Sequence, residues 1–155
     1  MTASEILLAA AHAALLVVSL ILIRIDIDQH RLPDAIVLTS AIGLAATLGL
    51  VAALAGDSAP LGRAAIGGLA LFGLYLLLGL AVPAGLGGGD VKLAALLGML
   101  LAWHGWTELA LGAITAFIVG GAHAAALLAT GRVSRDAHIA FGPWMIFGAW
   151  AGLLA

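Results

Sequence analysis

The sequence consists of long apolar runs that few polar residues interrupt, and this feature limits the folds open to the chain. The first run covers residues 5–25, EILLAAAHAALLVVSLILIRI. As a helix it is long enough to cross a bilayer core of roughly 30 Å at about 1.5 Å per residue. Such runs are continuous rather than alternating, which favours membrane helices over a membrane β-barrel.

Composition agrees with this interpretation. Hydrophobic residues make up 64% of the chain and charged residues only 9%, whereas ordinary globular domains have about 45–50% and about 25%. We therefore predict a single-domain, all-α integral membrane protein over residues 1–155, with about six transmembrane helices surrounded by membrane lipid. Polar or glycine-rich breaks delimit the expected helices, which are 5–25, 35–56, 64–82, 91–103, 107–129 and 139–155.

Charge and cysteine content exclude several functions. Six Lys and Arg against eight Asp and Glu give a net charge of −2, which argues against a nucleic-acid partner. The chain has no cysteine, which excludes disulfides, Cys-ligated zinc, iron–sulfur clusters and thiol nucleophiles within it. We expect no metal and no other cofactor.

The distribution of positive charge predicts the orientation in the membrane. With the N-terminus outside, the loops at 24–34, 90–92 and 131–138 face the cytoplasm, and among the positive residues only Arg63 lies outside. The positive residues of the three cytoplasmic loops are Arg24, Arg31, Lys92, Arg132 and Arg135. This is the positive-inside bias of membrane proteins. The same loops also hold five aspartates, Asp26, Asp28, Asp34, Asp90 and Asp136.

The glycine-rich segment GLGGGD at 85–90 lies at an unusual depth. From Asp90 to Trp103 there are 14 residues, which as a helix measure about 21 Å and fall short of the roughly 30 Å core. If Trp103 marks the outer interface, Asp90 lies below the inner one, where an ionisable residue indicates a functional site. Asp26 ends the first apolar run at a comparable level. Two carboxylates at the mouth of one cavity suggest acid–base chemistry on water.

Three motifs carry a family resemblance. The segment GLGGGDVKL at 85–93 resembles the G-x-G-x-G-D-x-K signature of the type IV prepilin peptidases, which are GxGD-type aspartic proteases of bacterial membranes. The segment IDIDQHRLPD at 25–34 resembles the one that holds their first catalytic aspartate, eight residues before the acidic member of a Pro-Asp pair. Here that spacing selects Asp26, since Asp34 follows Pro33. A third segment, IAFGPW at 139–144, resembles the F-G-P stretch that opens their last helix.

The resemblance implies an endopeptidase with Asp26 and Asp90 as its catalytic pair. Its partner is a prepilin or pseudopilin substrate, whose short basic leader is removed at the cytoplasmic face of the inner membrane. The chain looks like the short, peptidase-only branch, which includes the enzymes of Flp-type tight-adherence pili and the archaeal preflagellin peptidases. Because it has no cysteine, we expect no N-terminal methyltransferase or zinc region.

Further residues near the motifs are candidates for supporting roles. Gly87 and Gly89 are expected to adopt positive φ and to let a substrate strand approach the backbone closely. Lys92 is either a snorkelling anchor or a residue that tunes the site or contacts substrate. Asp28 is expected to be accessory or solvated. Asp34, which follows Pro33 and precedes an apolar run, is expected to be the N-cap of the second helix.

Three other functions stay open from the residues alone. A presenilin-like intramembrane protease shares GxGD, but its usual Tyr-Asp pair is replaced here by Ile25-Asp26. A small proton-coupled transporter would also use membrane carboxylates, and it would show ion flux without cleaving a prepilin. A structural assembly subunit would tolerate Asp90→Asn.

Overall fold

The computed structural model describes residues 2–81, 86–131 and 140–155, which form six α-helices and contain no strand. The helices are α1 (Ala3–Gln29), α2 (Asp34–Ala55), α3 (Ala59–Ala81), α4 (Gly88–His104), α5 (Trp106–Ala129) and α6 (Gly142–Leu154). The predicted all-α fold is confirmed. Residues 84–85 of the glycine-rich motif and most of the expected loop at 131–138 lie outside the described residues.

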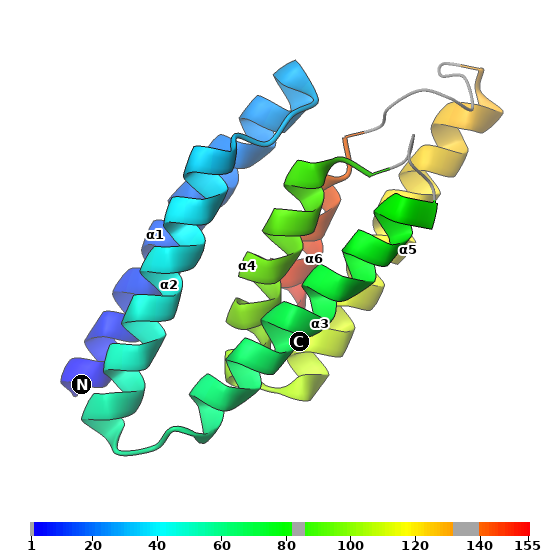
Figure 1. Ribbon diagram of the computed structural model, residues 1–155. Helices are drawn as coiled ribbons and strands as arrows, with labels where there is room; N and C mark the ends of the chain where they lie inside the picture. Colours follow the sequence, from blue (N-terminus) through cyan, green and yellow to red (C-terminus); the bar gives the residue numbers. More distant parts are fainter. Residues whose placement is uncertain (1, 82–85, 132–139) are drawn as a thin grey trace.

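Successive helices run in opposite directions (Figure 1). The α1–α2 hairpin stands beside a group formed by α3, α4, α5 and α6. Both termini lie at one end, together with the connection from α2 to α3 and the one at Gly105. The connection from α1 to α2 and the starts of α4 and α6 lie at the other end, so the three sequence motifs meet there.

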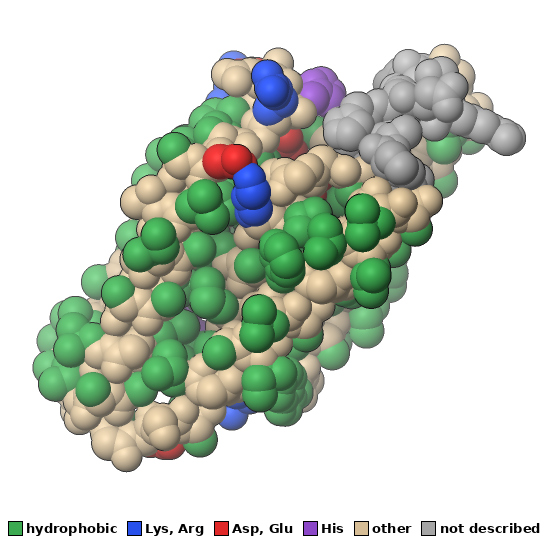
Figure 2. Space-filling model, in the orientation of Figure 1, with side chains coloured by type: hydrophobic (Ala, Val, Ile, Leu, Met, Phe, Trp, Pro, Cys, Tyr) green, Lys and Arg blue, Asp and Glu red, His purple; other side chains and the backbone are tan. Residues whose placement is uncertain are grey.

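Lipid-facing surface covers the flanks of the molecule. Four helices, α1, α2, α3 and α5, are long and apolar enough to cross a membrane. Leu69, Leu77 and Ile118 on these helices are 72%, 67% and 64% exposed, as expected for side chains that contact lipid rather than protein. Figure 2 shows apolar side chains over the flank and charged ones mainly toward the two ends. The chain is a multi-pass membrane protein.

Several helix boundaries differ from the sequence prediction, among them the starts of the third and last helices. The third helix begins at Ala59 rather than at 64, because Asp57 Oδ1 accepts a hydrogen bond from the Ala59 N–H at 2.9 Å. Pro60 then lies in the first turn, where its missing N–H costs no helical hydrogen bond. The last helix covers only Gly142–Leu154, and its 13 residues measure about 20 Å.

Helix α4 forms the centre of the protein and is short, as the sequence predicted. Its 17 residues measure about 26 Å, and α2, α3, α5 and α6 all pack against it. At its C-terminal end Arg63 Nε donates to the Ala102 carbonyl, and Arg63 Nη2 donates to the carbonyls of Trp103 and His104. The guanidinium thereby satisfies carbonyl groups that a helix end leaves without partners.

Glycines allow two close helix contacts. A Cβ built on Gly98 of α4 would lie 2.5 Å from the Gly67 carbonyl oxygen of α3, and one on Gly148 of α6 would lie 2.5 Å from the Gly112 carbonyl oxygen of α5. Small residues at such points let helix backbones approach each other. Not every helical glycine has this role, since a Cβ on Gly73 or Gly121 would meet nothing within 4 Å.

These contacts predict opposite outcomes for two glycine substitutions. Gly98→Ala should lower the free energy of unfolding by about 1–3 kcal/mol, because the added methyl group overlaps the backbone of α3. Gly73→Ala, in the exposed middle of α3, should leave stability unchanged or raise it by about 0.5–1 kcal/mol. Thermal unfolding of the two purified variants in detergent would measure the difference. Equal stability would contradict the packing argument.

The positive-inside pattern predicts which end faces the cytoplasm. In this cysteine-free chain, Gln29→Cys should resist an impermeant thiol reagent added to intact cells, whereas Asp57→Cys at the opposite end should react. Both should react after the membrane is opened. Labelling of position 29 from outside would overturn the orientation.

Candidate active site

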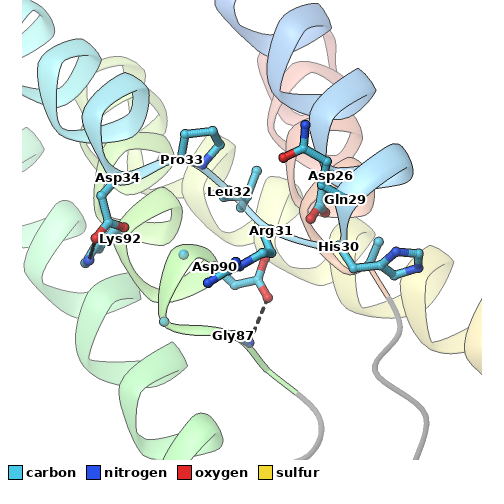
Figure 3. A pocket seen from close by; sticks show the side chains of 13 residues that line it. Asp26, Gln29, His30, Arg31, Leu32, Pro33, Asp34, Gly87, Asp90 and Lys92 are labelled. Carbon is cyan, nitrogen blue, oxygen red and sulfur yellow. Dashed lines mark hydrogen bonds and ion pairs between the residues drawn. The ribbon is translucent and has the colours of Figure 1, made fainter.

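A polar cavity of about 790 Å³ opens between the end of α1, the start of α2 and the start of α4. All three motif segments contribute to it (Figure 3). The residues that line it are Asp26, Gln29, His30, Arg31, Leu32, Pro33, Asp34, Gly87, Gly88, Gly89, Asp90, Lys92 and Ala140. The fold therefore brings Asp26 and Asp90, 64 positions apart in the sequence, to one cavity.

Asp26 lies in the last turn of α1, and its side chain is buried although it lines the cavity. The residue is only 4% exposed. Its backbone carbonyl accepts a hydrogen bond from the His30 N–H at 2.8 Å, where His30 adopts the left-handed conformation with φ of 51° and ends the helix. The helix end thus fixes the position of Asp26 relative to the α1–α2 connection.

Gly142 provides the space that the Asp26 carboxylate occupies. A Cβ built on Gly142 would lie 2.6 Å from Asp26 Oδ2. Gly142 is the glycine of the F-G-P motif and the first residue of α6, so this contact gives the motif a physical role. The sequence analysis identified the motif but did not predict which residue it contacts.

Asp90 is the third residue of α4, and its carboxylate is held by the backbone. Its Oδ2 accepts a hydrogen bond from the Gly87 N–H at 3.1 Å, while the Asp90 N–H donates to the Gly87 carbonyl at 3.0 Å. The residue is 7% exposed. Figure 3 shows the carboxylate hydrogen-bonded at the start of the helix. A helix N-terminus favours a negatively charged side chain.

The roles expected for the two motif glycines are corrected by the backbone geometry. Gly87 has φ of −80°, which any residue adopts, and Gly89 is not among the positive-φ glycines of the described chain. Close approach does occur at Gly89, where an added Cβ would lie 2.8 Å from the Leu32 Cβ. The backbone at Gly89 therefore packs against the α1–α2 connection of the same chain.

Asp34 and Lys92 form an ion pair at the edge of the cavity. Lys92 Nζ lies 2.5 Å from Asp34 Oδ2 and links the start of α4 to the start of α2. The expectation that Asp34 is an N-cap is wrong, since the N-cap is Pro33 and Asp34 begins the helix without a capping hydrogen bond. The carboxylate is directed to a lysine 58 positions away, which no local pattern predicts.

Asp28 lies outside the lining of this cavity. It forms an exposed ion pair with Arg24, 3.0 Å away and one helical turn earlier. The alternative that Asp28 is solvated is the one the structure supports. Asp28 thus serves as a natural comparison for the two buried aspartates.

An aromatic cluster that the sequence reading overlooked lies behind the site. Tyr75 of α3 is 2% exposed, and its ring centroid lies 5.3 Å from Phe117 and 6.2 Å from Phe141. Phe141 precedes Gly142, so the cluster supports the residue against which Asp26 packs. The only signal in the sequence was the isolated tyrosine in an apolar run.

The fold and the cavity define a polytopic α-helical membrane protein with two buried aspartates at one end. Comparison with known proteins identifies the class more closely. Residues 13–129 match the model of the type IV leader peptidase family, and the chain belongs to that family. The match separates it from presenilin-like proteases, transporters and assembly subunits. No solved structure matches the chain significantly.

Characterised relatives agree with this assignment. A Pseudomonas putida protein named prepilin leader peptidase/N-methyltransferase is 38% identical over 130 residues, which cover 84% of this chain and 44% of the relative. A protein of the same name from Stutzerimonas stutzeri is 36% identical over 70 residues, which cover 45% of this chain and 23% of the relative. The chain thus spans less than half the length of the relatives it matches.

The contact between Gly142 and Asp26 can be tested directly. The family resemblance implies that Asp26 is catalytic, so we expect Gly142→Ala to lower peptide cleavage by about tenfold or more, because the methyl group would displace the carboxylate from the cavity. Gly43→Ala on α2, where a Cβ meets nothing within 4 Å, is the control and should keep full activity. Cleavage assays with purified variants would measure both. Full activity in Gly142→Ala would show that the packing has no catalytic consequence.

Proposed function

We propose that this protein is an aspartic endopeptidase of the inner membrane that removes the short basic leader from type IV prepilins or pseudopilins. The observation that carries the proposal is that the family match includes Asp26 and Asp90, and that these two buried carboxylates line one cavity. The cavity lies at the end that the positive-inside rule assigns to the cytoplasm.

The two aspartates divide the chemistry of peptide hydrolysis between them. One ionised carboxylate takes a proton from a water molecule, and the resulting hydroxide attacks the scissile carbonyl carbon. The other carboxyl group, which is protonated, donates a hydrogen bond to the carbonyl oxygen and stabilises the tetrahedral intermediate. Proton transfer to the leaving nitrogen then completes cleavage of the C–N bond. The reaction requires neither a metal nor an acyl-enzyme.

The surroundings favour a particular assignment of these roles. Asp90 lies at a helix N-terminus and accepts a hydrogen bond from the Gly87 N–H, and both features stabilise its negative charge. Asp26 lies at a helix C-terminus, where the partial charge is negative and favours the protonated form. We infer that Asp90 acts first as the base and Asp26 as the acid.

The cavity lining carries charges of both signs outside the catalytic pair. Asp34 forms an ion pair with Lys92, and Arg31 adds a further positive charge. The proposal is confined to the peptidase reaction. The 155 residues contain no cysteine and so supply no Cys-ligated zinc site.

Removing either catalytic carboxylate should abolish cleavage. Asp26→Asn and Asp90→Asn should each reduce turnover of a prepilin to background, because one carboxyl group cannot serve as both base and acid. The double variant should be no worse than either single variant, since residues that act as a unit are not additive. Mass spectrometry of the prepilin after incubation would detect the shortened product.

Asp28→Asn provides the matched control for this experiment. Asp28 lies two positions from Asp26 but forms an exposed ion pair with Arg24, and such pairs contribute about 0–1 kcal/mol. The variant should therefore retain most activity. An inactive Asp28→Asn beside an active Asp26→Asn would mean that the wrong first aspartate has been identified.

A further inference from the structure

Helices α1 and α4, which carry Asp26 and Asp90, make a polar contact at the end of the protein opposite the cavity. His12 Nε2 and His104 Nε2 lie 2.9 Å apart. The two rings meet edge to face, with centroids 5.0 Å apart and an interplanar angle of 71°. His104 is the last residue of α4, so this contact lies far from the cavity and has no part in the proposed chemistry.

The surroundings of His12 determine the direction of this hydrogen bond. His12 Nδ1 lies 2.7 Å from the Leu8 carbonyl oxygen, which can only accept. In the tautomer that carries its hydrogen on Nδ1, the His12 ring accepts at Nε2 from His104 Nε2. The contact is a hydrogen bond between the two imidazole rings.

The spacing along both helices relates this contact to the catalytic pair. His12 and Asp26 are 14 positions apart on α1, and Asp90 and His104 are 14 positions apart on α4. On an α-helix this interval is about 21 Å and returns a side chain to within about 40° of the same face. The two helices thus present matching faces, with a histidine at one end and an aspartate at the other.

Few contacts hold the α1–α2 hairpin against the other helices. Trp150 Nε1 of α6 donates to Ser19 Oγ of α1 at 3.1 Å, and the Trp150 ring lies 6.4 Å from His12. Backbone contact of α1 outside its own hairpin is with α6 rather than with α4. Lipid provides no hydrophobic force between helices, so such polar contacts have a large share in fixing helix register.

We propose that His12 and His104 are positioning residues whose hydrogen bond sets the register of α1 against α4 and thereby the separation of Asp26 and Asp90. The inference rests on the proposed catalytic role of the aspartates. A shift of α1 along its axis would move Asp26 by the same distance, and misplacement of a reacting group by about 1 Å can cost about a hundredfold in rate.

Kinetics can separate positioning from a general structural role. His12→Leu, which removes the acceptor, should lower kcat about tenfold while KM changes by less than about twofold. The separate variant His12→Gln should retain most of the parent's kcat, because its carboxamide oxygen can accept from His104 at the place of the His12 Nε2. The control is Thr47→Val on α2, since the Thr47 hydroxyl bonds only to the Gly43 carbonyl of its own helix. It should match the parent.

A distance measurement tests the same inference without any activity. Spin labels on Ile27→Cys of α1 and Leu80→Cys of α3, both exposed, report how the hairpin lies against the other helices. The parent and His12→Gln should give one narrow distance distribution, and His12→Leu a shifted or broader one. An unchanged distribution in His12→Leu would overturn the proposal, whatever its kcat. If the parent cleaves no prepilin, the proposed function fails while this comparison still decides the positioning role.

Discussion

The site depends on burying two carboxylates in a protein that has few polar groups to stabilise them. Asp26 is 4% exposed and Asp90 is 7% exposed, and a buried charge is costly unless hydrogen bonds or a partner compensate for it. Helix geometry supplies part of that compensation, because Asp90 lies in the first turn of α4 and its carboxylate accepts a hydrogen bond from the N–H of the N-cap residue Gly87. The 17 residues of α4 measure about 26 Å. We expect so short a helix to start below the membrane surface, where its polar N-terminus can stabilise Asp90.

Close backbone packing also helps to form the site. The α1–α2 connection reaches the start of α4 because Gly89 has no side chain to obstruct Leu32, and the start of α6 reaches Asp26 because Gly142 has none. In both places, the missing Cβ belongs to one of the motifs that carry the family resemblance. The motifs therefore include the two points where the three segments of the cavity touch, as well as Asp26 and Asp90.

The sequence predicted those features that depend on local patterns. Apolar length predicted six helices, since backbone groups in lipid must be satisfied within helices, and motif spacing indicated Asp26 and Asp90. Features that depend on distant residues were missed or wrong. Asp34 looks like an N-cap next to Pro33, but its carboxylate lies against Lys92, 58 positions away. Likewise nothing near Gly142 in the sequence indicates that it faces Asp26, because only the packing of α6 against α1 creates that contact.

The distribution of contacts also determines where the molecule can open for a substrate. Helices α3 and α4 pack closely at glycines such as Gly67 and Gly98. Separating these two helices would expose polar backbone groups to lipid. The hairpin is joined to the other helices largely by packing of α2 on α4 and α1 on α6 and by polar side-chain contacts. Among the described residues these contacts include His12–His104, Ser19–Trp150 and Asp34–Lys92. The cavity lies between the hairpin and the other helices. A small movement of the hairpin would therefore widen the cavity at the lowest cost in free energy. We therefore expect a peptide to enter between α2 and α4, past the exposed Asp34–Lys92 pair.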